Sequence, residues 1–160
     1  MALPSPSLKR RALRLLSRRE YSRLELERKL ARYASEPGEL AQVLDELQVK
    51  GFIDARRVLE SVLHRRSAGL GVARIRQELN DKGLDANVVR DAVAGLQTSE
   101  LERAFCVWRK KFGNHHSELA PDAAERARQM RFLASRGFSG DTIRRVMTGA
   151  TGAPDDNAAT

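Results

Sequence analysis

Apolar residues recur three and four positions apart along most of the chain, which is the spacing of one face of an α-helix. The series Leu40, Val43, Leu44 and Leu47 shows the pattern clearly. Such stripes predict nine short helices, which cover approximately residues 8–16, 22–33, 37–51, 54–68, 72–83, 85–96, 99–112, 121–137 and 139–147. The pattern therefore predicts an all-α protein built from short amphipathic helices.

A helix-terminating signature occurs three times: a Leu, two residues, a cation, a Gly and a large apolar residue. It covers Leu47–Phe52, Leu79–Leu84 and Leu133–Phe138. The Gly can take the left-handed conformation that closes a helix, and the apolar residue after it can pack back on the Leu, as in a Schellman motif. The cation faces the negative end of the helix dipole. These stops predict helices joined by tight turns.

Two predicted helix starts carry a Ser followed three residues later by a Glu, which is the pattern of a capping box. They are Ser22–Glu25 and Ser99–Glu102. The second helix start opens a stripe that contains Phe105 and Trp108. Helical spacing places these two aromatic residues in the core, and a base-stacking platform is the alternative.

The nine helices group into three units of three. We expect repeats over residues 8–53, 54–97 and 98–148, with disordered segments over 1–7 and 149–160. Each small unit would be marginally stable alone, so neighbouring units must share a core. The sequence thus predicts three tandem three-helix repeats in an elongated array. No leftover apolar stripe demands a dimer, so we expect a monomer.

Charge adds the prediction of an anionic partner. The formal net charge is +8, and residues 1–33 hold ten Lys or Arg against three Glu. Residues 34–64 hold three cations against six acids, and residues 65–90 hold six against three. Solvated helix faces explain part of this unevenness, and two basic surfaces separated by an acidic one are the alternative. Nucleic acid, an acidic protein face or a nucleoprotein would fit such surfaces.

Two groups of cations are candidates for binding a partner or DNA phosphates. The first lies in the N-terminal segment and comprises Lys9, Arg10, Arg11, Arg14 and Arg18. The second surrounds the turn between the fourth and fifth helices and comprises Arg65, Arg66, Arg74, Arg76 and Lys82. In that turn, Gly69 and Gly71 could form a backbone nest for phosphate or a plain interhelix turn.

Catalytic and metal-binding patterns are absent from the sequence. His115 and His116 are adjacent and have no carboxylate or Cys at ligand spacing, which makes a poor metal site. The one cysteine, Cys106, excludes an internal disulfide and is expected to be a core thiol. We therefore expect a protein that is not an enzyme and takes no cofactor. No apolar run approaches the length of a membrane span and no secretory signal is present, so we expect a cytoplasmic protein.

The central segment resembles the RecX family of recombinase regulators. The family pattern there is an Arg/Lys pair, then Gly-x-Gly-x-x-x-Ile-x-x-Glu-Leu, then Lys-Gly, and Arg65–Leu84 contains all of it. Further similarity lies in Gly51–Asp54, Ser22–Leu30, Lys111–Gly113 and Arg131–Phe138. Where this family tends to place an aromatic and small residues after the Gly-Phe-Ile-Asp stretch, the chain instead has Arg57-Val58-Leu59.

The resemblance implies three three-helix repeats in a curved, elongated molecule. It also implies a modulator, usually an inhibitor, of the RecA recombinase that binds the RecA–DNA filament and blocks its growth, ATP hydrolysis and strand exchange. A helix-turn-helix DNA-binding regulator and a protein-only helical-repeat scaffold are the alternatives. Because the cations are spread over several units and no helix gathers base-reading residues, we expect DNA alone to bind weakly through its phosphates.

Overall fold

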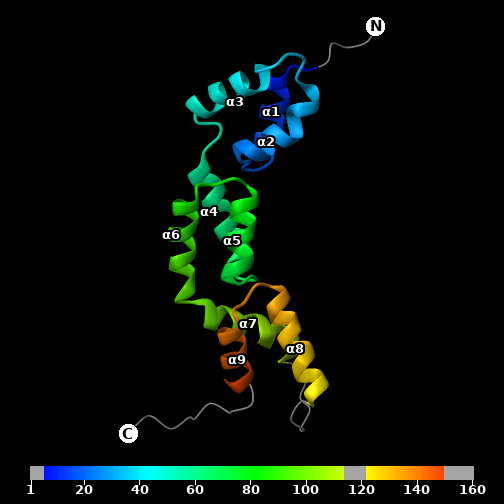
Figure 1. Cartoon of the computed structure of the whole chain (residues 1–160), viewed down its shortest axis with the longest axis vertical. Coiled ribbons are helices and arrows are strands. Elements are labelled where there is room, and N and C mark those ends of the chain that lie inside the picture. The colour runs from blue at the N-terminus through cyan, green and yellow to red at the C-terminus, as the bar shows by residue number, and fades with distance from the viewer. Residues whose placement is uncertain (1–5, 114–121, 150–160) are drawn as a thin grey trace. The chain divides into compact units, whose positions relative to one another are not determined.

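The computed structural model describes residues 6–113 and 122–149, and every regular element within these ranges is helical (Figure 1). The described elements are α1 (Leu8–Leu16), α2 (Arg23–Leu30), the 3-10 turn η1 (Ala31–Tyr33), α3 (Glu39–Val49), α4 (Ala55–Arg66), α5 (Val72–Asp81), α6 (Ala86–Gln97), α7 (Glu100–Phe112), α8 (Ala123–Ser135) and α9 (Gly140–Gly149). The prediction of an all-α fold with nine α-helices is confirmed for these ranges.

Several expectations fall outside the described residues. They are the disorder expected for residues 1–5 and 150–160, and the prediction that His115 and His116 make a poor metal site. Ser7, which composition assigns to the disordered N-terminal segment, is the N-cap of α1, and its hydroxyl oxygen accepts the backbone N–H of Arg10.

The chain divides into two compact units. Unit 1 comprises Met1–Leu63 with Glu78–Ala86, and unit 2 comprises His64–Gln77 with Asn87–Thr160. The expected middle repeat, residues 54–97, is divided between them, since α4, α5 and α6 each have residues in both units.

Unit 1 is built on α1, α2 and α3, which pack on one another (Figure 1). Their buried faces come from the apolar stripes seen in the sequence, since Leu26, Leu44 and Leu47 are fully buried. The core residues are Leu8, Ala12, Tyr21, Leu26, Leu30, Leu44, Leu47 and Ile53. Burial of such a side chain contributes roughly 1.5–3 kcal/mol relative to exposure, so this core stabilises unit 1.

The core of unit 2 that α7, α8 and α9 form centres on Leu133 and Val146. Phe105 and Trp108 pack against this core, and the indole N–H of Trp108 donates to the side-chain oxygen of Gln129 at 2.9 Å. The prediction that Phe105 and Trp108 are core residues is therefore confirmed. Cys106 lies on the exposed side of α7, so the expectation that it is a core thiol is wrong.

All three terminating signatures form Schellman motifs. Gly51, Gly83 and Gly137 have φ values of +74°, +72° and +82°, so each takes the left-handed conformation. The residue after each Gly donates its backbone N–H to the carbonyl oxygen of the Leu five positions before it, over 2.8–3.3 Å. The first motif differs in packing, because Phe52 is 48% exposed and Ile53 is buried in its place.

Of the two expected capping boxes, only the first forms. The Ser22 hydroxyl oxygen accepts the backbone N–H of Glu25, and the Glu25 carboxylate accepts the backbone N–H of Ser22. Ser99 makes no side-chain cap because its φ and ψ of −101° and 4° lie outside the extended region that a capping side chain needs. Its neighbour Glu100 is buried and accepts the backbone N–H of Val72 and the hydroxyl of Thr142, each at 2.9 Å.

The α4–α5 turn and the α8–α9 turn meet backbone to backbone within unit 2. The N–H of Gly71 donates to the carbonyl of Arg136 at 2.8 Å, and the N–H of Ala73 donates to the carbonyl of Gly137 at 3.3 Å. A Cβ at Gly71 would overlap the backbone of Gly137. The N–H of Gly69 donates to the carbonyl of Arg66. Because both glycine N–H groups are already used, the phosphate-nest hypothesis is wrong.

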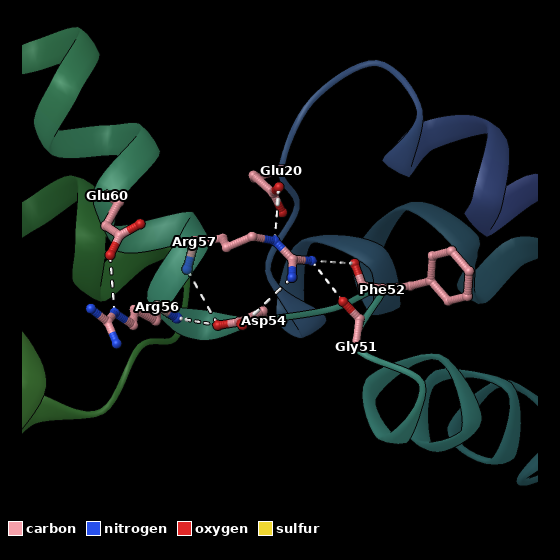
Figure 2. Close-up of polar contacts among 7 residues, drawn as sticks. All are labelled: Glu20, Gly51, Phe52, Asp54, Arg56, Arg57 and Glu60. Atoms are coloured by element: carbon pink, nitrogen blue, oxygen red, sulfur yellow. Dashed lines mark hydrogen bonds and ion pairs between the residues drawn. The ribbon is translucent and has the colours of Figure 1, made fainter.

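The departure at Arg57 from the family pattern has a structural role. Figure 2 shows its guanidinium between the start of α4 and the end of α3, where it donates to the carbonyls of Gly51 and Phe52 at 2.8 and 3.2 Å. Its Nε contacts the carboxylate of Glu20 at 3.0 Å. Arg103 does the same in unit 2, where it donates to the carbonyls of Ser67, Leu70 and Leu96. In each unit, an arginine near the start of a helix donates to backbone carbonyls of preceding segments.

Candidate nucleic-acid interface

Four of the five N-terminal candidates lie around one groove in unit 1. The groove has a volume of about 670 Å³ and runs between α1 on one side and the end of α2 with η1 on the other. Its lining residues are Pro6, Arg10, Arg11, Arg14, Leu15, Arg18, Lys29, Leu30, Arg32 and Tyr33. Six of these carry a positive charge and none carries a negative one. We call this feature the basic groove.

The position of the basic groove follows from the two faces of α1. Leu8 and Ala12 are buried in the core of unit 1, so the opposite face of the helix is turned to solvent. Arg10 and Arg14 are four positions apart on that exposed face. Arg18 follows in the turn after α1, and the cations therefore line up along the groove.

Tyr33 holds two arginines at one end of the basic groove. The guanidinium carbon of Arg11 lies 4.0 Å from the centre of the tyrosine ring, and that of Arg32 lies 4.7 Å from it. Arg11 also donates its Nε–H to the carbonyl of Pro6 at 3.0 Å. These cation–π contacts fix the two charges without neutralising them, because the ring carries no net charge.

Arg14 and Arg18 are two available cations of the basic groove. Both are exposed, and neither side chain makes an ion pair or a hydrogen bond with any residue in 6–113 or 122–149. A groove lined with cations and with no carboxylate to compete for them attracts a polyanion, and guanidinium groups match phosphate oxygens in geometry. The arrangement can therefore hold the phosphate backbone of a nucleic acid.

Lys29 and Arg32 are groove residues that the sequence prediction omitted. They lie three positions apart in the segment 22–33, so helical spacing alone already puts them on one face. What the sequence could not show is that this face stands opposite α1, because the packing of α1 on α2 decides it.

Lys9 lies outside the basic groove. Its ammonium group pairs with the carboxylate of Glu46 on α3 at 2.6 Å, and that carboxylate also contacts Lys50. Hydrogen bonds from Lys50 and Lys9 lower the pKa of Glu46 to about 2. Lys9 therefore makes an ion pair within unit 1, and its role towards a partner stays a prediction.

Lys82 is buried, so it does not form part of an exposed basic surface as predicted. Its ammonium group contacts the carboxylate of Glu25 at 2.9 Å, and Arg19 contacts the same carboxylate at 3.0 Å. Burial opposes ionisation of Glu25, but the bonds from Arg19, Lys82 and the Ser22 backbone outweigh it and lower the pKa of Glu25 to about 2. This buried pair ties α2 to the segment 78–86 within unit 1.

Replacing Glu25 with Gln should destabilise the protein by roughly 3 kcal/mol at pH 7, because it leaves the buried ammonium of Lys82 unpaired. The pKa of Glu25 is lowered from 4.5 to about 2 on folding, so its stabilisation is complete above about pH 4.5 and is lost as the pH falls towards 2. Urea unfolding at pH 7 and pH 3 tests this. From pH 7 to pH 3, Glu25→Gln should lose less stability than the wild type. An equal loss in both proteins would contradict the stabilising role of the ionised Glu25.

The four remaining candidates, Arg65, Arg66, Arg74 and Arg76, are exposed in unit 2. Arg74 donates to the side-chain oxygen of Gln77 at 3.2 Å, and Arg76 has no ion pair within the described part of the chain. The structure places them on α4 and α5 and not around the basic groove.

Neither 6–113 nor 122–149 contains a group of three His, Cys, Asp or Glu side chains that could hold a metal ion. No helix in these ranges has the length and apolar character needed to cross a membrane.

Comparison with known proteins identifies the family. Residues 9–47 match the model of the first RecX three-helix domain, and residues 98–147 match that of the third. The regulatory protein RecX of Leptothrix cholodnii is 53% identical over 144 residues, which is 90% of this chain and 89% of that protein. The regulatory protein RecX of Ralstonia nicotianae is 44% identical over 158 residues, which is 98% and 97% of the two chains.

The fold is shared with a solved RecX structure. The crystal structure of RecX from Lactobacillus salivarius superposes with a TM-score of 0.68, covering 88% of this chain and 92% of that one at 23% identity. The likeness supports the assignment of three-helix repeats. On the two domain matches and the extended sequence identity together, the chain belongs to the RecX family of regulatory proteins.

Proposed function

We propose that the protein modulates the RecA recombinase, and that it inhibits RecA by binding the RecA–DNA filament and blocking its extension, ATP hydrolysis and strand exchange. Membership of the RecX family supports a regulatory role. The single structural observation that carries the proposal is the basic groove, because its six cations and lack of acids suit the phosphates of filament DNA.

The basic groove suits an auxiliary DNA contact better than independent DNA binding. Its cations come from α1, the turn after it, α2 and η1, whereas a helix-turn-helix protein gathers base-reading residues on one recognition helix. Phosphate contacts carry no sequence information, so binding to DNA alone should be weak, tolerant of sequence and strongly reduced by salt. Specificity would then come from contacts with the recombinase.

Strand exchange tests the proposed function. RecA is assembled on circular single-stranded DNA, the protein is added below the concentration of RecA, and joint molecules formed with linear duplex DNA are counted on a gel. We expect fewer joint molecules and shorter filaments as the protein is added. Unchanged strand exchange at an excess of protein over RecA would remove the function.

Replacing Arg74 and Arg76 with Ala should weaken inhibition of RecA and leave the melting temperature nearly unchanged. Both side chains are exposed. The atoms of Arg74 that lie close to Gly137 are its backbone atoms and its Cβ, and Ala keeps all of them. Ala is also the better helix former, which offsets part of any lost packing. The melting curve and RecA inhibition are measured on the same sample. A stable variant that inhibits fully would exclude these arginines from the interface.

A further inference from the structure

A second hollow lies within unit 2 and has a different chemical character from the basic groove. It has a volume of about 440 Å³ and is bordered by the turn between α4 and α5, by α7 and by α8. Its lining residues are Ala68, Gly69, Val107, Lys110, Lys111, Phe132 and Arg136. We call this feature the α7–α8 pocket.

The α7–α8 pocket combines an apolar wall with three cations. Val107 and Phe132 are partly buried and belong to the edge of the unit 2 core. Lys110 and Lys111 are exposed at its rim, and neither has an ion pair with a residue in the described ranges. Arg136 contributes the third charge. Among the residues that the structure describes, no Asp or Glu lines the pocket.

Arg136 contains a hydrogen-bond donor without an acceptor. Its Nε is buried, and no atom of the described residues accepts its proton. The guanidinium is held in place because its carbon lies 4.4 Å from the centre of the Phe132 ring, and the backbone carbonyl of Arg136 is fixed by the N–H of Gly71. Buried donors are normally paired, so the guanidinium that carries this one has unused hydrogen-bonding capacity beside the pocket.

We propose that the α7–α8 pocket binds a segment of a partner protein in which an Asp or Glu stands next to a large apolar residue. The carboxylate would accept from the guanidinium of Arg136, whose planar fork matches two carboxylate oxygens. The apolar side chain would cover Val107 and Phe132. Lys110 and Lys111 would attract the acidic segment from the rim. The proposal concerns protein recognition and stands independently of the proposed action on RecA.

Charge and shape favour a peptide over a nucleic-acid backbone here. A phosphate backbone is charged along its length and has no apolar side chain to place on Val107 and Phe132. The basic groove, by comparison, is larger and presents six cations against three. The two features therefore select different ligands: phosphates in unit 1 and an acidic-apolar peptide in unit 2.

Selection from a random peptide library tests the proposal. A phage library of random dodecapeptides is panned on the full chain, with Arg136→Lys in solution as the counter-selection. Lys keeps the positive charge but has no Nε–H and no planar fork. Arg131→Lys is the matched control, since Arg131 is exposed on α8, which Arg136 directly follows, and does not line the pocket. Affinities of enriched peptides are measured by fluorescence anisotropy, and the Nε–H resonance of Arg136 is followed by NMR.

We expect enriched peptides to carry Asp or Glu beside Leu, Ile or Phe, and to shift the Arg136 Nε–H resonance. Their affinity should fall about tenfold in Arg136→Lys and remain unchanged in Arg131→Lys. Lys110→Gln with Lys111→Gln provides a second test if Arg136→Lys lowers the melting temperature. The proposal is overturned if no such peptide is enriched, if both arginine variants bind equally, or if a single-stranded oligonucleotide and not the peptides shifts the Arg136 resonance.

Discussion

Gly71→Ala is expected to destabilise unit 2 by about 3 kcal/mol or more, which corresponds to a fall in melting temperature of roughly 6–12 °C for a chain of this size. A Cβ at this position would overlap the carbonyl group of Gly137 and the backbone nitrogen of Phe138. Backbone atoms cannot rotate away as a side chain can. The two turns would have to separate, and the hydrogen bond from Gly71 to Arg136 would lengthen or break.

Gly69→Ala is the matched control for this prediction. The residue lies two positions away in the same turn, and a Cβ there would meet no atom within 4 Å. Its effect should stay within about 0.5 kcal/mol. Trp108 is the only tryptophan of the chain and lies in unit 2, so its fluorescence during urea unfolding reports on that unit. If the two variants are equally stable, the α4–α5 and α8–α9 turns do not pack as closely at Gly71 as described.

Arg14→Glu with Arg18→Glu is expected to lower affinity for single-stranded DNA by at least about tenfold at low salt. The variant removes two cations from the basic groove and adds two charges that repel phosphate. The salt dependence should also weaken, because log affinity changes with log salt by about 0.7 for each phosphate neutralised on a single strand. Loss of two contacts should therefore reduce the slope by about 1.4. Fluorescence anisotropy of a labelled oligonucleotide over a salt series measures both quantities.

The control for this variant is Arg126→Glu with Arg131→Glu, which gives the same net charge. Both residues are exposed on α8 and lie outside the basic groove. If binding depends only on net charge, the two variants will lose affinity equally and the basic groove has no special role. If the basic groove binds the backbone, the control will retain most of the affinity and most of the salt slope.

The helices and their ends could be predicted because local rules determine them. Gly51, Gly83 and Gly137 close helices through a left-handed conformation that their own residue type permits. The Ser22–Glu25 capping box also forms within one turn of helix. Ser99 has the same local pattern, yet its hydroxyl donates to the carbonyl of Leu96 and accepts from the Nε–H of Arg103. Its neighbour Glu100 bonds to Val72 and Thr142, which are distant in sequence.

The candidate site was predicted in part, for a related reason. The sequence groups five cations in one basic N-terminal segment, and four of them line the basic groove: Arg10, Arg11, Arg14 and Arg18. The pairing of Lys82 with Glu25 joins residues 57 positions apart. Nothing local distinguishes Lys82 from a solvated cation, since only the packing of two distant segments buries it.

ATP hydrolysis by RecA on single-stranded DNA reports in one assay both the proposed inhibition of RecA and the role of the basic groove. Hydrolysis is measured with wild type, Arg14→Glu/Arg18→Glu and Arg126→Glu/Arg131→Glu, each added below the concentration of RecA. We expect that wild type and the α8 variant slow hydrolysis, and that the groove variant requires about tenfold more protein for the same effect. Equal inhibition by all three proteins, or unchanged hydrolysis with an excess of wild type, would contradict it.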